Sequence, residues 1–154
     1  MDDQYFVRTF EIDALNTSLK LYQKCEGDVG CVVWDASIVL AKYLEEIYKK
    51  NSKQFQNLTV VELGSGAGCV GLTAACFGAK VLLTDLSSVM PLLKKNLEAN
   101  YEAIKKHNGE AHAEVLEWGK IIHSPLQPVL ILIADCVYYK EIKLSKPLSN
   151  WLGR

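Results

Sequence analysis

The sequence lacks the features that mark a membrane protein, a secreted protein or a general polyanion binder. No apolar run approaches the ~20 residues of a membrane-spanning helix, since the longest strongly apolar run, 129–134, has the length of one strand. The chain begins Met-Asp-Asp, unlike the basic and apolar start of a signal peptide. Seventeen Lys and Arg residues against eighteen Asp and Glu give a formal net charge of −1, so no general attraction for nucleic acid follows.

Cysteine occurs in a pattern that supports neither a disulfide framework nor a metal site. The chain has five cysteines, an odd number, with no C-x-x-C pair and no histidine at ligand spacing. We therefore expect reduced, buried thiols in a cytoplasmic protein, and no metal. The cysteines are Cys25, Cys31, Cys69, Cys76 and Cys136.

What is present is the composition of an ordinary globular domain. Hydrophobic residues make up 49% and charged residues 23%, which excludes collagen-like, low-complexity and wholly disordered classes. A chain of 154 residues suits one domain and is long enough to bury roughly 70% of its unfolded surface.

The order of the predicted elements is a hairpin followed by alternating strands and helices. Residues 5–13 and 19–25 are rich in β-forming side chains around a polar turn, which predicts the hairpin. Apolar residues at helical spacing predict a helix over 36–50. Further along we expect strands at 58–63, 80–84, 113–116 and 129–134, and helices at 69–77 and 87–106. This alternation predicts an α/β fold, a parallel sheet with helices on its faces.

A glycine-rich turn between the first of these strands and its helix has the form of a nucleotide-cofactor loop. The run Gly64-Ser65-Gly66-Ala67-Gly68 allows a sharp turn and a close approach of the backbone to a ligand. Asp85 follows Gly64 by 21 residues, at the end of the next strand, where a carboxylate can accept hydrogen bonds from ribose hydroxyls. The turn therefore predicts a cofactor site.

Two classes of cofactor fit this loop. Gly66, Gly68 and Gly71 match the dinucleotide fingerprint G-x-G-x-x-G, so a nicotinamide-dependent oxidoreductase is an alternative. Glu62 stands two residues before the first glycine, where a negative charge would repel a pyrophosphate. The same charge would attract the ammonium and sulfonium of S-adenosylmethionine, which the sequence therefore favours.

Aromatic and acidic side chains stand at other predicted element ends. Trp34 precedes the first helix and Trp118 follows the third parallel strand, and an aromatic face can stack on adenine or line a cationic ligand. Asp135 follows the fourth parallel strand, with Tyr138 three residues on. Because ligands bind at the carboxyl ends of parallel strands, this pair is expected over the reactive end of the cofactor.

Five segments together resemble the seven-strand methyltransferases of the methyltransferase-like protein-lysine group. They are GCVVWDASIVLAKYLE (30–45), VVELGSGAGCVGL (60–72), LLTDL (82–86), EWG (117–119) and LIADCVYY (132–139). The resemblance implies a Rossmann-like class I methyltransferase sheet with helices on both faces and an N-terminal β-hairpin, truncated after the fourth parallel strand. It implies a single, C-terminally shortened methyltransferase domain over 1–154, with an N-terminal β extension (1–34) and a cofactor-binding core (58–139).

The resemblance also implies an activity, an S-adenosylmethionine-dependent protein-lysine N-methyltransferase. Asp135 and Tyr138 match the group's Asp-x-x-Tyr motif beside the target lysine, and Glu62 is expected to face the methionine part of the cofactor. The expected protein partner is the valosin-containing protein, an AAA ATPase, or another ATPase or chaperone. A shortened, catalytically inactive form is the alternative, because members of the group continue beyond the fourth strand. The expected cofactor contacts are Trp34, Gly64, Ser65, Gly66, Asp85, Trp118 and Ala134.

Overall fold

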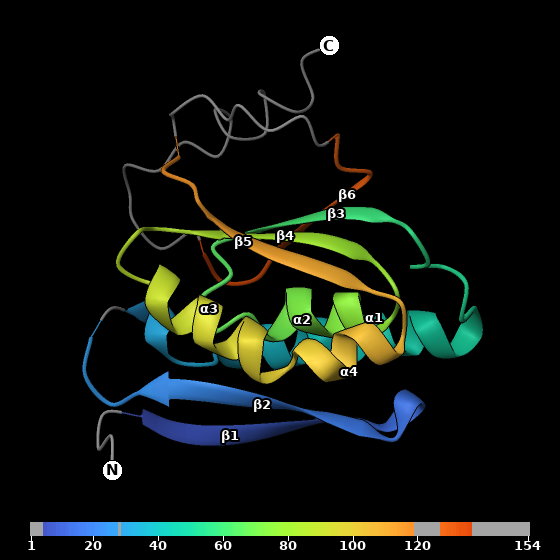
Figure 1. The fold of residues 1–154 in the computed structure, drawn as a ribbon, viewed down its shortest axis with the longest axis horizontal. Helices are drawn as coiled ribbons and strands as arrows, with labels where there is room; N and C mark the ends of the chain where they lie inside the picture. The colour runs from blue at the N-terminus through green and yellow to red at the C-terminus, as the bar shows by residue number, and fades with distance from the viewer. Residues whose placement is uncertain (1–4, 28, 119–126, 137–154) are drawn as a thin grey trace.

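The described residues form three layers in the order sheet, helices, hairpin (Figure 1). The structure is a computed structural model that describes residues 5–27, 29–118 and 127–136. A parallel sheet forms one outer layer, the helices form the middle layer, and an N-terminal hairpin covers the helices from the other side (Figure 1).

The parallel sheet has the strand order β5-β4-β3-β6. Its strands are β3 (Thr59–Leu63), β4 (Lys80–Asp85), β5 (Glu110–Val115) and β6 (Leu130–Ile133), all parallel to their neighbours. The four parallel strands expected from the sequence are therefore confirmed, although β5 begins three residues before the predicted 113. Within the described part of the chain, the apolar strand β6 lies at one edge of this sheet.

The middle layer consists of α1 (Asp35–Lys50), α2 (Cys69–Cys76), α3 (Met90–Ala99) and α4 (Tyr101–Lys106). All four lie on the same side of the sheet (Figure 1), so within the described ranges helices cover one face of it.

The single helix expected over 87–106 is in fact two helices. It starts later than predicted, at Met90, with Pro91 in the first turn where a missing N–H costs nothing. The break falls at Asn100, whose backbone is not helical. Its side-chain amide pairs with the backbone of Lys20, so a contact with the hairpin ends α3 at this point.

The N-terminal hairpin is confirmed. β1 (Tyr5–Ile12) pairs antiparallel with β2 (Thr17–Lys24), and the chain reverses through a 3-10 turn (Asp13–Leu15) and Asn16, whose φ is 47°. One face of the hairpin packs on the helices through four buried side chains: Phe10, Ile12, Leu19 and Leu21.

Two buried asparagines on the helical layer hold the outer edge of β2. Asn96 Oδ1 accepts from Tyr22 N at 2.7 Å, and Asn96 Nδ2 donates to Tyr22 O at 3.0 Å. Asn100 pairs with Lys20 in the same way, at 2.8 and 2.9 Å. The two amides thus take the place of a neighbouring strand. Asn96 Nδ2 also donates to Ala67 O at 2.9 Å, which connects the hairpin to the glycine-rich turn.

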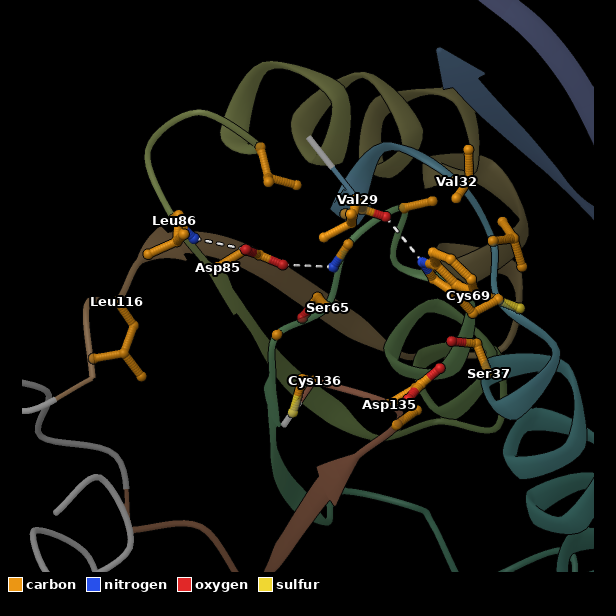
Figure 2. A pocket seen from close by; sticks show the side chains of 18 of the residues that line it. Val29, Val32, Ser37, Ser65, Cys69, Asp85, Leu86, Leu116, Asp135 and Cys136 are labelled. Carbon is orange, nitrogen blue, oxygen red and sulfur yellow. Dashed lines mark hydrogen bonds between the residues drawn. The ribbon is translucent and has the colours of Figure 1, made fainter. Parts of the chain in front are cut away.

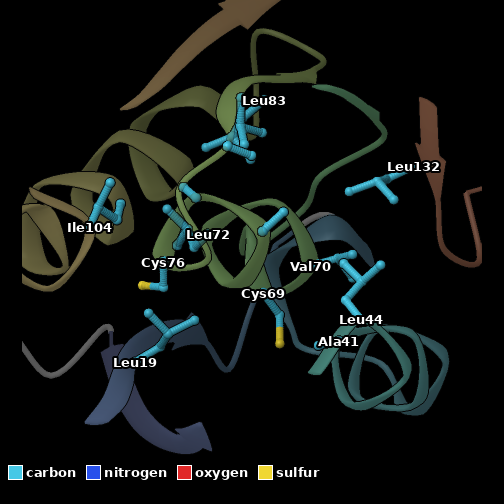
Figure 3. Close-up of a cluster of buried hydrophobic side chains, with 14 of the residues drawn as sticks. Leu19, Ala41, Leu44, Cys69, Val70, Leu72, Cys76, Leu83, Ile104 and Leu132 are labelled. Atoms are coloured by element: carbon cyan, nitrogen blue, oxygen red, sulfur yellow. The ribbon is translucent and has the colours of Figure 1, made fainter. Parts of the chain in front are cut away.

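The short helix α2 is the centre of the core. All its residues are buried, as expected for a helix that is apolar on every side (Figure 3). A Cβ on Gly71 would lie 2.2 Å from Leu83 Cδ2, so only glycine allows α2 to approach β4 this closely. Side chains from the hairpin, α1, α4 and the sheet surround it, including Leu19, Leu44, Leu83, Ile104 and Leu132.

Candidate functional site

A cavity of about 600 Å³ opens at the carboxyl ends of the parallel strands (Figure 2). This volume lies within the range of small-molecule and cofactor pockets. Its walls come from the segment before α1, the turn after β3, and the ends of β4, β5 and β6. Its lining includes these predicted site residues: Trp34, Gly64, Ser65, Gly66, Asp85, Trp118, Ala134 and Asp135. Tyr138 lies outside the described residues.

Two glycines of the turn after β3 allow close backbone approaches. Gly64 has a φ of 63°, and a Cβ there would lie 2.4 Å from the Cβ of Cys136 at the end of β6. Gly66 has a φ of 54°, and a Cβ there would lie 2.9 Å from the carbonyl oxygen of Gly30. Side chains at these positions would strain the turn and displace two walls of the cavity.

The turn is fastened to β4. Ser65 N donates to Thr84 O at 2.9 Å, and Thr84 N donates to Ser65 Oγ at 3.0 Å. The Thr84 hydroxyl donates to Glu62 O at 2.6 Å. These buried hydrogen bonds fix the turn before any ligand binds, which lowers the entropy that binding must remove.

Asp85 holds the glycine turn from the end of β4. Its Oδ2 accepts from Gly66 N at 2.6 Å and its Oδ1 accepts from Leu86 N at 2.7 Å (Figure 2). Asp85 also lines the cavity, and a carboxylate oxygen can accept more than one hydrogen bond. The arrangement suits hydroxyl donors such as those of a ribose.

Trp34 stands at the wall formed by the segment before α1. Its indole Nε1 donates to Val29 O at 2.8 Å, which fixes the ring although the residue is 47% exposed (Figure 2). Trp118, at the end of β5, packs against the smaller apolar cluster that contains Leu116. The two aromatic side chains are therefore held by separate parts of the fold, and both line the cavity.

Glu62 does not line the cavity, which corrects the expectation that it faces the cofactor. The pleat of β3 directs it to the helical side, and its Oε2 accepts from Gly71 N in the first turn of α2 at 3.0 Å. Burial raises the pKa of this carboxyl to about 8, so its charge is largely absent at neutral pH. Because Glu62 occupies this first-turn N–H, α2 is also less suited to hold a pyrophosphate.

The charge of the cavity comes from other residues. Asp85, Glu117 and Asp135 line it, and among its described lining residues there is no lysine, arginine or histidine. Such a wall favours a cationic ligand over a pyrophosphate. A cationic ligand therefore remains the expectation, but it follows from Asp85, Glu117 and Asp135 and not from Glu62.

Asp135 lies two residues after the end of β6 and has a φ of 51°, unusual for a residue with a side chain. Figure 2 shows its carboxyl and the Ser37 side chain, from the first turn of α1, directed toward each other. The cavity also contains residues that the sequence analysis did not assign, among them Val29, Ser37, Leu86, Val89, Leu116 and Glu117. Leu86 and Glu117 directly follow strand residues already recognised, so adjacency to a strand end could have indicated them.

Two remaining expectations concern thiols and metals. All five cysteines are free, and four are buried, but Cys25 is exposed. Across 5–27, 29–118 and 127–136, no group of three or more His, Cys, Asp and Glu side chains could hold a metal ion. In the same ranges no helix has the length and apolar character needed to cross a bilayer.

The chain belongs to the lysine methyltransferase family, whose sequence model matches residues 14–154. It is 39% identical over 113 residues to protein N-lysine methyltransferase METTL21A of Xenopus tropicalis, covering 73% of this chain and 50% of that protein. It is 34% identical over 146 residues to protein-lysine N-methyltransferase EFM6 of Saccharomyces cerevisiae, covering 76% and 56%. With EEF1A lysine methyltransferase 3 of Xenopus tropicalis it shares 33% over 128 residues, covering 81% and 54%. The chain spans about half the length of these curated relatives.

A solved structure supports the fold class. The T. Thermophilus 16S rRNA N2 G1207 methyltransferase (RsmC), solved with AdoMet and guanosine, matches with a TM-score of 0.54. The match has 24% sequence identity and covers 72% of this chain and 27% of that one. The parallel sheet with its helical layer is therefore the α/β fold of class I methyltransferases.

Proposed function

We propose that this chain is an S-adenosylmethionine-dependent protein-lysine N-methyltransferase whose cofactor occupies the cavity at the carboxyl edge of the sheet. The observation that carries the proposal is that one cavity is lined by residues from segments far apart in the sequence: Trp34, Gly66, Asp85, Trp118 and Asp135. Membership of the lysine methyltransferase family supports the reaction class.

The residues that line the cavity could contact the ribose, the adenine and the methionine part of the cofactor. The Asp85 carboxylate would accept the ribose hydroxyls, and the neighbouring apolar wall of Leu86, Leu116 and Trp118 would hold the adenine. The turn from Gly64 to Gly66 and the carboxylate wall would hold the cationic methionine part. When bound, the cofactor supplies an electrophilic methyl group on sulfur.

The role we assign to Asp135 is to orient the target amine. A lysine of pKa ~10.4 must lose its proton before it can attack, which costs about 4.6 kcal/mol at pH 7. Burial beside a positive ligand lowers the pKa of that amine, and a fixed carboxylate can hold it in line with the methyl group. Tyr138, which matches the same motif, would be the second orienting group.

For the substrate we propose a lysine of the valosin-containing protein, and for the location the cytoplasm. The proposal rests on the resemblance of five sequence segments, 30–45 and 132–139 among them, to the methyltransferase-like protein-lysine group. Elongation factor 1A is the competing protein substrate, because one relative is named for it.

The test has two stages. Thermal melts of the 154-residue chain with and without S-adenosylhomocysteine measure binding, and a hundredfold excess over Kd should add about 2.7 kcal/mol of stability. Transfer of labelled methyl groups to purified valosin-containing protein or elongation factor 1A then measures activity. Asp135→Ala should abolish methyl transfer and should change the affinity for S-adenosylhomocysteine by no more than a few fold. A variant that kept its rate would remove Asp135 from the reaction.

A catalytically inactive form is the second candidate function, favoured by the chain spanning about half of its relatives. It predicts no transfer to either protein, whether or not the melt responds to the ligand. A melt that does not respond would contradict the active enzyme, because the chain would then lack a working cofactor site, and it would leave the inactive form.

A further inference from the structure

Two tyrosines and two lysines of the N-terminal hairpin gather with a lysine of α3 on the surface. The rings of Tyr5 and Tyr22 meet edge to face, with centroids 6.2 Å apart and an interplanar angle of 87°. Lys95 Nζ, from α3, lies 4.9 Å from the Tyr5 centroid and 4.6 Å from the Tyr22 centroid. Lys20 Nζ lies 5.0 Å from Tyr22, and Lys24 Nζ lies 5.4 Å from Tyr5. We name these five residues the Tyr-Lys patch.

The Tyr-Lys patch is a concentrated positive surface. Within the described ranges, the ion pairs involve other lysines, and Lys20, Lys24 and Lys95 have no carboxylate within 4.0 Å. A hydrogen bond from Lys20, with the charges of Lys20 and Lys95, lowers the pKa of the Tyr22 hydroxyl, as expected of a positive local potential. Three like charges held together favour the binding of an anion.

Apolar surface borders the charges. Val7 pairs with Tyr22 in the hairpin register, and 46% of it is exposed. The patch therefore offers ammonium donors, aromatic edges and an exposed aliphatic side chain side by side. Of these side chains, tyrosine is the one enriched at interfaces between proteins.

The patch is continuous with the cavity along the chain. β2 ends at Lys24, and the segment that follows reaches Val29 and Gly30, which line the cavity. Lys95 is on α3, which begins directly after the cavity residue Val89. The open end of the hairpin and the start of α3 lie on the same side of the molecule (Figure 1).

We propose that the Tyr-Lys patch binds an acidic segment of the protein substrate, at a distance from the lysine that is methylated. This inference rests on the proposed function, and it makes an acidic segment away from the target lysine a determinant of substrate choice. A carboxylate-bearing peptide supplies counter-charges that the described residues do not place within 4.0 Å of the three ammonium groups, and its aliphatic carbons can contact Val7.

A peptide is favoured over a nucleic acid by the geometry of the rings. Single-stranded nucleic acids gain most from stacking bases on aromatic faces. Each ring of the patch already has two ammonium groups within 5.4 Å of its centroid, so a base would have to displace them.

The test compares two full-length variants that change the net charge equally. The patch variant is Lys20→Gln, Lys24→Gln and Lys95→Gln, and the control variant is Lys50→Gln, Lys53→Gln and Lys106→Gln, three exposed lysines elsewhere. Fluorescence anisotropy measures binding of a labelled hexaglutamate peptide, a hexaglutamine peptide and a hexa-adenylate RNA. We expect the patch variant to bind hexaglutamate about tenfold more weakly, and the control to stay within about twofold of the native chain.

Equal loss in both variants would overturn the proposal, because binding would then reflect net charge alone. Binding of the RNA as tight as that of hexaglutamate would overturn it in favour of a nucleic-acid surface. The single variant Lys95→Met keeps the aliphatic part of the side chain and should by itself weaken hexaglutamate binding. It tests the patch even if the triple variant misfolds. S-adenosylhomocysteine should bind all variants equally. If the native chain does not bind it, the proposed function fails, whereas the peptide result still decides the patch.

Discussion

Replacing Glu62 by glutamine should make the fold more stable at alkaline pH. The Glu62 carboxyl is buried between β3 and α2, and burial raises its pKa from 4.5 to about 8. The nearby charge of Asp85 acts in the same direction, while hydrogen bonds from Ser65 and Gly71 oppose it. Glutamine keeps the shape and an acceptor for Gly71 N–H but has no proton to lose.

The sign and size of the effect follow from linkage. Below the unfolded pKa of 4.5, both states hold the proton and the favourable burial of the neutral acid is fully present. As the pH rises toward 8, the unfolded chain ionises while the folded one does not, so stability falls. A shift from 4.5 to about 8 is 3.5 pKa units, or at most about 5 kcal/mol at ~1.36 kcal/mol per unit. A domain has only about 5–15 kcal/mol in total, so the loss should be easy to measure.

Urea denaturation at about pH 5 and about pH 8 measures the effect. The native chain should lose several kcal/mol between the two pH values, and Glu62→Gln should lose much less. Glu98→Gln, at an exposed position on α3, is the control and should follow the native chain. If Glu62→Gln kept the full pH dependence of the native chain, the carboxyl would not be the buried neutral acid inferred here.

Three further predictions concern binding and packing. Asp85→Ala should weaken S-adenosylhomocysteine binding by about tenfold or more, measured by calorimetry, because it removes both the ribose acceptor and the brace on Gly66 N. Asn96→Ala should cost roughly 3 kcal/mol in urea denaturation, because Tyr22 N, Tyr22 O and Ala67 O lose their partners; a loss near zero would contradict the fastening role. NADH should not raise the melting temperature; a shift like that of S-adenosylhomocysteine would revive the oxidoreductase alternative.

The elements and the cavity could be predicted from sequence because both depend on local patterns. Short apolar runs mark the parallel strands, and residues after such runs must meet at one edge of the sheet, which is why Asp85, Trp118 and Asp135 were found. The break at Asn100 could not be predicted in this way. Its cause is a pair of hydrogen bonds to Lys20, 80 residues away, and no local pattern carries that information.

Glu62 and Asp85 show how neighbouring strand ends give two carboxyls opposite roles. Glu62, within β3, is directed by the pleat to the helical side, where it loses water, keeps its proton near neutral pH and accepts from Gly71 N. Asp85, the last residue of β4, faces the cavity and braces the glycine turn instead. An acidic residue in the sequence therefore contributes negative charge to the cavity only where the fold leaves its carboxylate near solvent or ligand. By that criterion we propose that the carboxylates that select a cationic cofactor are Asp85, Glu117 and Asp135, which line the cavity, whereas Glu62 accepts a hydrogen bond from the first turn of α2.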